Sequence, residues 1–157
     1  MRLLAGFLQV VVFASALLFN TTNALADSLP DNYDLSTLDD LHLPASHATQ
    51  LAAIQQAGQL NEAGIVQQGQ QLLAGIAQTG SAQEAFILQQ GSQHLALISQ
   101  VGVANSALIS QSGAYNQAAI EQLGANNHAL IEQSGNGLQS SIKQYGSSQS
   151  VQVRQYR

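Results

Sequence analysis

The feature that most constrains this chain is a pattern that recurs at a constant interval of eleven positions from residue 50 onward, without insertion or deletion. Eight units read A-x-I-x-Q-x-G, beginning at Ala52 and ending with the unit of Ala129. Two more follow, S-x-I-x-Q-x-G from Ser140 and V-x-V-x-Q-x-R from Val151, which makes ten units. A period this regular is typical of repeat proteins, in which each unit packs only against its neighbours in the stack.

A period of eleven also fits a right-handed helical coiled coil, because it spans three helical turns at about 3.67 residues per turn. The recurring positions within a unit, however, alternate with variable ones, and this spacing places side chains on one face of a strand. A helix would also contain a glycine in every unit, at a cost of about 1 kcal/mol each relative to alanine. The repeat therefore predicts strands.

We expect the Ala, Ile and Gln of each unit to point to one side of a strand of about five residues. The Gly should lie at the turn, often with an Asn three positions later, because both residues form turns. Two units then make one strand–turn–strand–turn rung, and ten units make five rungs. The sequence predicts an all-β fold over residues 50–157, a parallel β-helix-like β-solenoid with the cross-β character of amyloid.

In this fold alternate units lie on opposite walls, so that identical residues stack one rung apart. A charged side chain would lie directly over the same charge in the next rung and destabilise the column, whereas stacked side-chain amides hydrogen-bond to each other. This accounts for a chain with only 8% charged residues and 24 Gln. The first wall should hold Ile54, Gln56, Ile76, Gln78, Ile98, Gln100, Ile120, Gln122, Ile142 and Gln144, and the second Ile65, Gln67, Ile87, Gln89, Ile109, Gln111, Ile131, Gln133, Val153 and Gln155.

The two ends of such a column are the parts expected to pair with other chains. No capping element is recognisable in the sequence, so we expect the first and last rungs to expose unpaired strand edges. Most proteins protect such edges because they pair with other chains. An uncapped, repetitive column of low charge is therefore expected to template the addition of further strands, as a functional amyloid does.

Two segments precede the repeats. Residues 1–26 have a positive start at Arg2, an apolar run from Leu3 to Phe19 and a small-residue cleavage site at Ala24-Leu25-Ala26, which predicts a secretory signal peptide rather than a transmembrane anchor. Residues 27–49 contain five Asp, both prolines and no Lys or Arg, and we interpret them as an acidic disordered leader.

The composition excludes several classes of function. Without Cys the chain has no disulfide scaffold or thiolate metal site, and a net charge of −5 with four basic residues disfavours nucleic-acid binding. Glu121 and Glu132 are expected on opposite walls, so they make no catalytic pair. His94 and His128 are expected to lie solvated in turns, with no spacing that suits a metal. We predict a protein that is not an enzyme and needs no cofactor or metal.

The repeats resemble those of the curlin family, the subunits of bacterial curli fibres, whose form is Q-x-G-x-x-N-x-A-x-x-x-Q. Residues 56–67 and 111–122 match it in full, and the resemblance covers residues 50–157. The resemblance implies a secreted structural subunit of an extracellular fimbrium at the outer cell surface. Its partners would be itself, the major subunit and outer-membrane export and assembly factors, and its role adhesion and biofilm formation. We expect the loss of the repeat Asn in five units to blur the turns but not the Ile and Gln ladders. The residues that replace it are Leu72, Gln83, His94, Leu138 and Gln149.

The family has a major subunit that forms the fibre and a minor subunit that nucleates it. The chain is more similar to the minor subunit, because its leader lacks a Gly-rich segment, its last unit ends in Arg, and all cations after residue 26 lie between residue 143 and the C-terminus. We expect a basic and aromatic end rung to anchor the protein or bind an assembly factor, through Lys143, Tyr145, Arg154, Tyr156 and Arg157. Alternatively these cations only guard an edge strand. The chain could also be the major subunit, or a monomeric β-solenoid adhesin.

Overall fold

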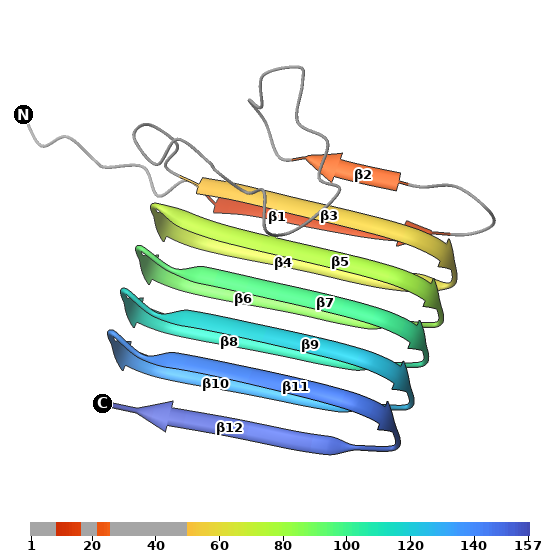
Figure 1. Ribbon diagram of the computed structural model, residues 1–157. Helices are drawn as coiled ribbons and strands as arrows, with labels where there is room; N and C mark the ends of the chain where they lie inside the picture. The colour runs from red at the N-terminus through yellow and green to blue at the C-terminus, as the bar shows by residue number, and fades with distance from the viewer. Residues whose placement is uncertain (1–8, 17–21, 26–49) are drawn as a thin grey trace, which may run out of the picture.

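The structure, a computed structural model, describes residues 9–16, 22–25 and 50–157, and every element in these ranges is a strand. Figure 1 shows them stacked in a column. In the described residues no helix is long and apolar enough to span a membrane. The strands are β1 Gln9–Ala16, β2 Thr22–Leu25, β3 Gln50–Gln59, β4 Asn61–Gln70, β5 Leu72–Ser81, β6 Glu84–Ser92, β7 Leu95–Val103, β8 Ser106–Ala114, β9 Gln117–Ala125, β10 His128–Asn136, β11 Gln139–Ser147 and β12 Ser150–Tyr156.

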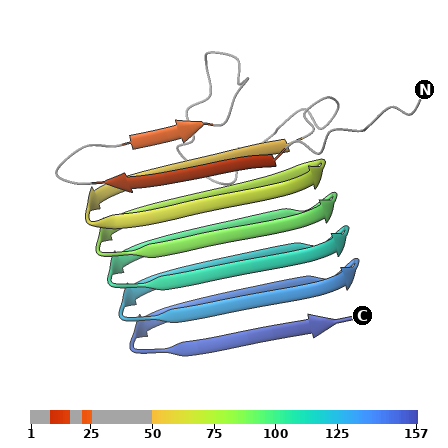
Figure 2. The same cartoon turned by 180° about the vertical axis from the view of Figure 1, so that it is seen from behind.

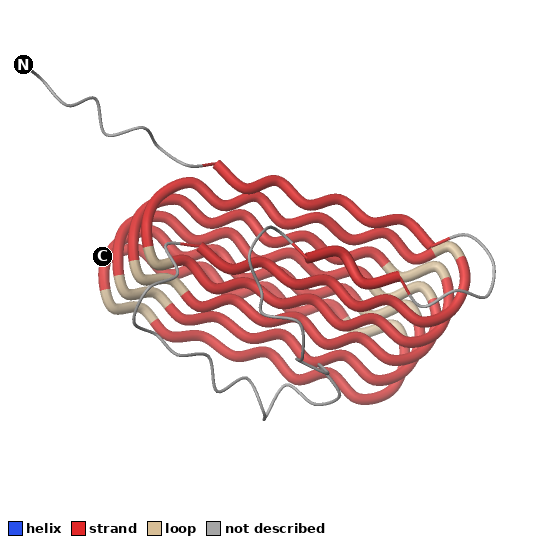
Figure 3. Tube along the Cα trace, turned by 90° about the horizontal axis from the view of Figure 1, so that it is seen from above, coloured by secondary structure: helices blue, strands red, loops and turns tan. Residues whose placement is uncertain are grey.

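The strands from β3 onward alternate between two facing sheets, which Figure 3 shows from the end of the column. One sheet has the order β11-β9-β7-β5-β3 and the other β12-β10-β8-β6-β4, with every pair parallel. Each residue pairs with the one two units further on, as Ile54 does with Ile76 and Ile65 with Ile87. The predicted β-solenoid with two units in each rung is confirmed, and so is the assignment of alternate units to opposite walls.

The core between the two sheets consists of the Ala and Ile positions of the repeat. Nine Ile side chains from Ile54 to Ile142 are at most 4% exposed, and Val153 in the last strand packs against them. Burying one Ile contributes about 1.5–3 kcal/mol. Since each wall supplies only a narrow row of apolar side chains, the ladder residues hold the sheets together only when several rungs are stacked.

The repeat strands β3 to β12 are longer than the predicted five residues, with seven to ten each, because the repeat Gly does not end a strand. Gly102 has a φ of 128°, and a Cβ there would lie 1.9 Å from the carbonyl oxygen of Gly124. The Gly thus bends the strand while the next rung lies against it. The chain reverses two positions later, at a left-handed residue such as Ala104 or Tyr115, with φ of 55° and 58°.

The N-terminal edge of the column is not bare, which corrects one prediction. β1 pairs antiparallel with β4, and β2 pairs antiparallel with β3, as Figure 2 shows from behind. The sequence of β1, QVVVFASA, is apolar and β-branched, so it suits a strand as well as the apolar part of a signal peptide. The signal peptide over residues 1–26 stays a prediction, and the leader of residues 27–49 lies outside the described residues.

Candidate functional site

The Gln residues of the repeat form two buried amide ladders inside the column. On one wall Gln78 Nε2 donates to Gln100 Oε1 at 2.9 Å, and Gln100 Nε2 donates to Gln122 Oε1 at 2.8 Å. Gln100 Nε2 also donates to the backbone carbonyl of Glu84 at 3.0 Å. Because a carbonyl can only accept, this second bond fixes which end of the amide is nitrogen. The ladders therefore have a defined direction along the column.

A second set of ladders lies at the corners, where the Asn of the repeat lies between two strands, as predicted. This Asn is also buried, with Asn116 0% exposed. Asn116 Nδ2 donates to the carbonyls of Ser112 and Gly135, and its Oδ1 accepts from the backbone N–H of Leu138 at 3.0 Å. Asn thus joins one rung to the next where the Gly bends the strand. The constant position of this Asn, three residues after the Gly, is the feature of the sequence that points to this bonding role.

Three replacements of this Asn, Gln83, His94 and Gln149, preserve part of the corner bonding, so the expectation that they blur the turns is wrong for them. The first is Gln83, which is 1% exposed, and its Nε2 donates to the carbonyls of Thr79 and Gly102, both at 3.0 Å. Its Oε1, however, is buried without a partner among the described residues. The Gln side chain is one methylene longer than Asn, which places its oxygen away from the backbone N–H that Asn would bind.

The second replacement, His94, is also buried, at 2% exposure, which corrects the prediction of a solvated turn histidine. Its Nε2 lies 3.1 Å from the carbonyl of Gln90, and its Nδ1 lies 3.3 Å from the backbone nitrogen of Asn116. A neutral ring that donates from Nε2 and accepts at Nδ1 satisfies both contacts. Burial lowers the pKa of His94 below its usual value, and the bond to Gln90 opposes this only in part. His128 is exposed, as predicted.

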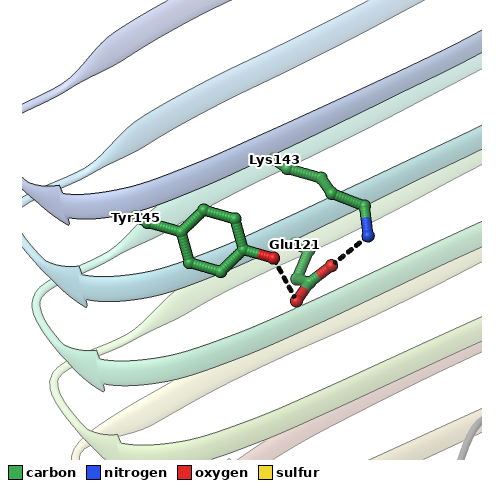
Figure 4. Close-up of polar contacts among 3 residues, drawn as sticks. All are labelled: Glu121, Lys143 and Tyr145. Atoms are coloured by element: carbon green, nitrogen blue, oxygen red, sulfur yellow. Dashed lines mark hydrogen bonds and ion pairs between the residues drawn. The ribbon is translucent and has the colours of Figure 1, made fainter.

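The predicted anchoring residues lie at the last rung but on two faces. Lys143 and Tyr145 are on β11, and both bind Glu121 of the rung before, as Figure 4 shows. Lys143 Nζ lies 2.9 Å from Glu121 Oε2, and Tyr145 Oη donates to Oε1 at 2.9 Å. The hydrogen bond from Lys143, with that from Tyr145, lowers the pKa of Glu121. Bonding to this carboxylate raises the pKa of both Lys143 and Tyr145.

The other face has the remaining three residues. Arg154 on β12 pairs with Glu132 at 3.1 Å, again one rung apart, while the Tyr156 side chain is 65% exposed. The backbone N–H of Arg157 donates to the carbonyl of Ser134, so Arg157 continues the backbone ladder at the position where earlier units have Gly. The structure therefore does not bring the five residues together in one patch, and two of the three cations are already paired with Glu.

No group of three or more His, Asp or Glu side chains in residues 9–16, 22–25 and 50–157 could hold a metal ion. The arrangement can instead present ordered rows of backbone groups and side-chain amides at each end of a column.

The comparisons with known proteins agree with this architecture. The curlin-associated repeat family matches three times, over residues 72–102, 102–135 and 124–156. Together these matches cover more than half of the 157 residues, and the solenoid extends the same ladders back to residue 50. No curated protein and no solved structure matches the chain. With curlin-associated repeats matched over residues 72–156, which form strands β5 to β12 of one parallel solenoid, the chain belongs to the curlin repeat family.

Proposed function

We propose that this protein is a subunit of extracellular curli amyloid fibres, and that it is the minor subunit that nucleates their growth. Membership of the curlin repeat family supports a self-assembling fibre subunit with a structural rather than an enzymatic role. The observation that carries the proposal is the unbroken register through all ten repeat strands, in which each residue pairs with the one two units further on. A further rung can follow the same register at an end of the column.

Nucleation in this proposal is templating by a preformed edge. A single strand pair is marginal in water, and the slow step of fibre growth is forming the first stacked rungs. An already folded column removes that step, because an incoming chain pairs its backbone with an ordered edge and gains the Ile and Gln ladder contacts at once. Adhesion and biofilm formation would follow from the fibres that it starts.

The last rung is proposed to hold the protein at the cell surface or on an assembly factor. Lys143 and Arg154 keep their positive groups outward, but each is paired with a Glu. Tyr145 and Tyr156 are exposed, at 53% and 65%. The contact would therefore use exposed aromatic rings together with Arg157, more than free cations. Deletion of residues 147–157 tests it: fibres that stay attached to the producing cell would contradict anchoring.

A seeding experiment tests the nucleating role. A small molar fraction of this protein is added to a soluble major curlin subunit, and polymerisation is followed by thioflavin fluorescence. A nucleator should abolish the lag phase at substoichiometric ratio. If the protein instead polymerises alone into long fibres, and shortens the lag phase only as much as preformed fibres of the major subunit do, it is a major subunit. An unaltered lag with soluble monomer would favour the adhesin alternative.

A further inference from the structure

The chain passes from β10 to β11 through the only Asn-Gly dipeptide of the sequence, Asn136-Gly137. Asparagine is among the chemically labile residues of proteins. A glycine after it removes the Cβ that would hinder the approach of the following backbone nitrogen to the Asn side chain. Whether this nitrogen can attack the side-chain amide, which is the first step of deamidation, depends on how firmly both groups are held.

The side chain of Asn136 is held less firmly than the Asn side chains at the corners. Asn136 is the last residue of β10, is exposed, and makes no side-chain hydrogen bond to the described residues. Asn105 and Asn116, in contrast, are at most 1% exposed, and each Nδ2 donates to two backbone carbonyls. A buried amide bound in this way cannot turn toward the next nitrogen without losing both bonds. Of these three residues only Asn136 is free to react.

The attacking nitrogen lies in an outermost turn. Gly137 N–H donates to the carbonyl of Ala114 at 2.9 Å, as Tyr115 N–H does to Ser92 at 3.0 Å one rung earlier. The turn of Gly137 thus stacks on that of Tyr115, whereas within residues 50–157 no turn stacks on the other side of Gly137. The space around it is also open, since a Cβ at Gly137 would meet no atom within 4 Å. The bond to Ala114 can therefore open by local fraying while the column stays folded.

The reaction needs no reagent other than water. Once the bond to Ala114 opens, Gly137 N loses its proton to solvent base and attacks Cγ of Asn136. The N–Cγ bond forms, the Cγ–Nδ2 bond breaks, and Nδ2 leaves as ammonia, which gives a cyclic succinimide. Water then opens the ring. Attack at Cγ gives Asp, and attack at the backbone carbonyl carbon of Asn136 gives isoaspartate, in which the main chain runs through the former side chain.

Isoaspartate puts an additional carbon into the backbone at a turn that is bonded closely to the previous rung. Leu138 N–H donates to Asn116 Oδ1 at 3.0 Å, and the Leu138 carbonyl accepts from Gln117 N–H at 2.8 Å. A longer backbone directly before Leu138 displaces both of these groups. Each residue of β11 is paired with a fixed partner on β9, starting with Gln139 opposite Gln117, so a displaced turn disturbs the register at the start of this strand.

We propose that Asn136-Gly137 is a site of spontaneous deamidation, and that its isoaspartate product releases the start of β11 from β9 while the earlier rungs stay paired. The substrate is the chain itself and the co-reactant is water. This goes beyond the role in fibres, because it describes a covalent change of the protein with time after its synthesis.

Incubation of the protein in mildly alkaline buffer tests the chemistry. The protein is produced from the full-length gene, collected after export by the host, and kept dilute and soluble. Cleavage after Glu132 and Lys143 isolates residues 133–143, in which Asn136 is the only Asn. Mass spectrometry follows the mass increase of deamidation in this fragment, and enzymatic methylation detects isoaspartate. We expect the modified fraction to grow with time here and not in the fragments that contain Asn105 and Asn116.

Two variants serve as controls for the site. Asn136→Gln keeps a side-chain amide at the same exposed position but lengthens the side chain, so the cyclic succinimide cannot form and the isoaspartate signal should be lost. Gly137→Ala should slow the reaction, because its Cβ hinders the approach of the nitrogen to Cγ. An unmodified Asn136 in the incubated wild type, or equal modification of Asn105 and Asn116, would overturn the assignment of the site.

Hydrogen exchange of the backbone amides tests the structural consequence. In the incubated wild type the amides at the start of β11 should exchange faster than in fresh protein, whereas those of β5 and β7 should be unchanged. Asn136→Asp introduces the new carboxylate on an unaltered backbone, so its β11 should exchange as slowly as in fresh wild type. Equally fast exchange in Asn136→Asp would refute the role of the additional backbone carbon. Unchanged exchange in the incubated wild type, or faster exchange throughout the column, would refute a local release of β11.

Discussion

The close approach of successive rungs at the repeat glycines gives the sharpest prediction about stability, which Gly102→Ala tests. A Cβ on Gly102 would lie 1.9 Å from Gly124 O and 2.8 Å from its carbonyl carbon, at a φ of 128°. The neighbouring rungs must separate by about 1 Å or more, which breaks roughly two inter-rung backbone hydrogen bonds at about 1 kcal/mol each. The strained backbone adds about 1–3 kcal/mol. We expect the free energy of unfolding to fall by about 3–5 kcal/mol.

Gly137→Ala is the matched control for that substitution. Gly137 also has a positive φ, 67°, but a Cβ there would meet no atom within 4 Å. Only the left-handed conformation opposes the new methyl group, at about 1–2 kcal/mol. Urea denaturation of dilute protein, followed by far-ultraviolet circular dichroism, gives both values by linear extrapolation. If Gly102→Ala destabilises the protein no more than Gly137→Ala does, the close approach of successive rungs is not what requires glycine.

Three further predictions follow from single positions. Burial lowers the pKa of His94 in the folded protein, so the unfolded state binds a proton at this side chain more readily. The free energy of unfolding should therefore be highest above a pH of about 6.5 and fall below it. In thermal melts between about pH 7 and pH 5, His94→Asn should reduce this fall, and an unchanged pH dependence would mean that other groups cause it. Gln83→Asn should stabilise the protein by about 1 kcal/mol in urea, by giving the backbone N–H of Asn105 an acceptor in place of an unpaired oxygen, and a loss of stability would contradict this. Arg157→Gly should speed fibre elongation, because a further rung in the same register would bring a carbonyl against the Arg157 Cβ, as Gly146 O lies 1.8 Å from a Cβ placed at Gly124. Arg157→Ala keeps the Cβ and should not speed elongation; equal acceleration by both variants would point to the charge instead.

The parts of the fold that depend on periodicity could be predicted from the sequence. The spacing of Ala, Ile and Gln determines which side chains face inward, and the period of the repeat determines the rung, so both walls were assigned correctly down to Ile142 and Val153. These features depend on the repeat as a whole, and a departure in one unit does not alter them.

The rest depended on close approach between atoms of different rungs, which a residue pattern does not specify. Asn is a residue type that favours turns. Only the position of the Gly135 carbonyl shows that the side-chain amide of Asn116 points into the column and bonds to the next rung. His94 was misplaced for the same reason. The apolar run of β1 fits a targeting segment as well as an edge strand, so the residue pattern alone does not predict its pairing with β4.

The constant offset of two units between paired residues limits how the length of such a chain can change. Removing or adding one whole unit leaves the Ala, Ile, Gln and Gly of all later units meeting their own kind. Removing only part of a unit shifts every later strand against its neighbours, and a shift by a single position turns the Ile row outward. Viable insertions and deletions in this region are therefore restricted to whole units, and the height of the column changes only in discrete steps.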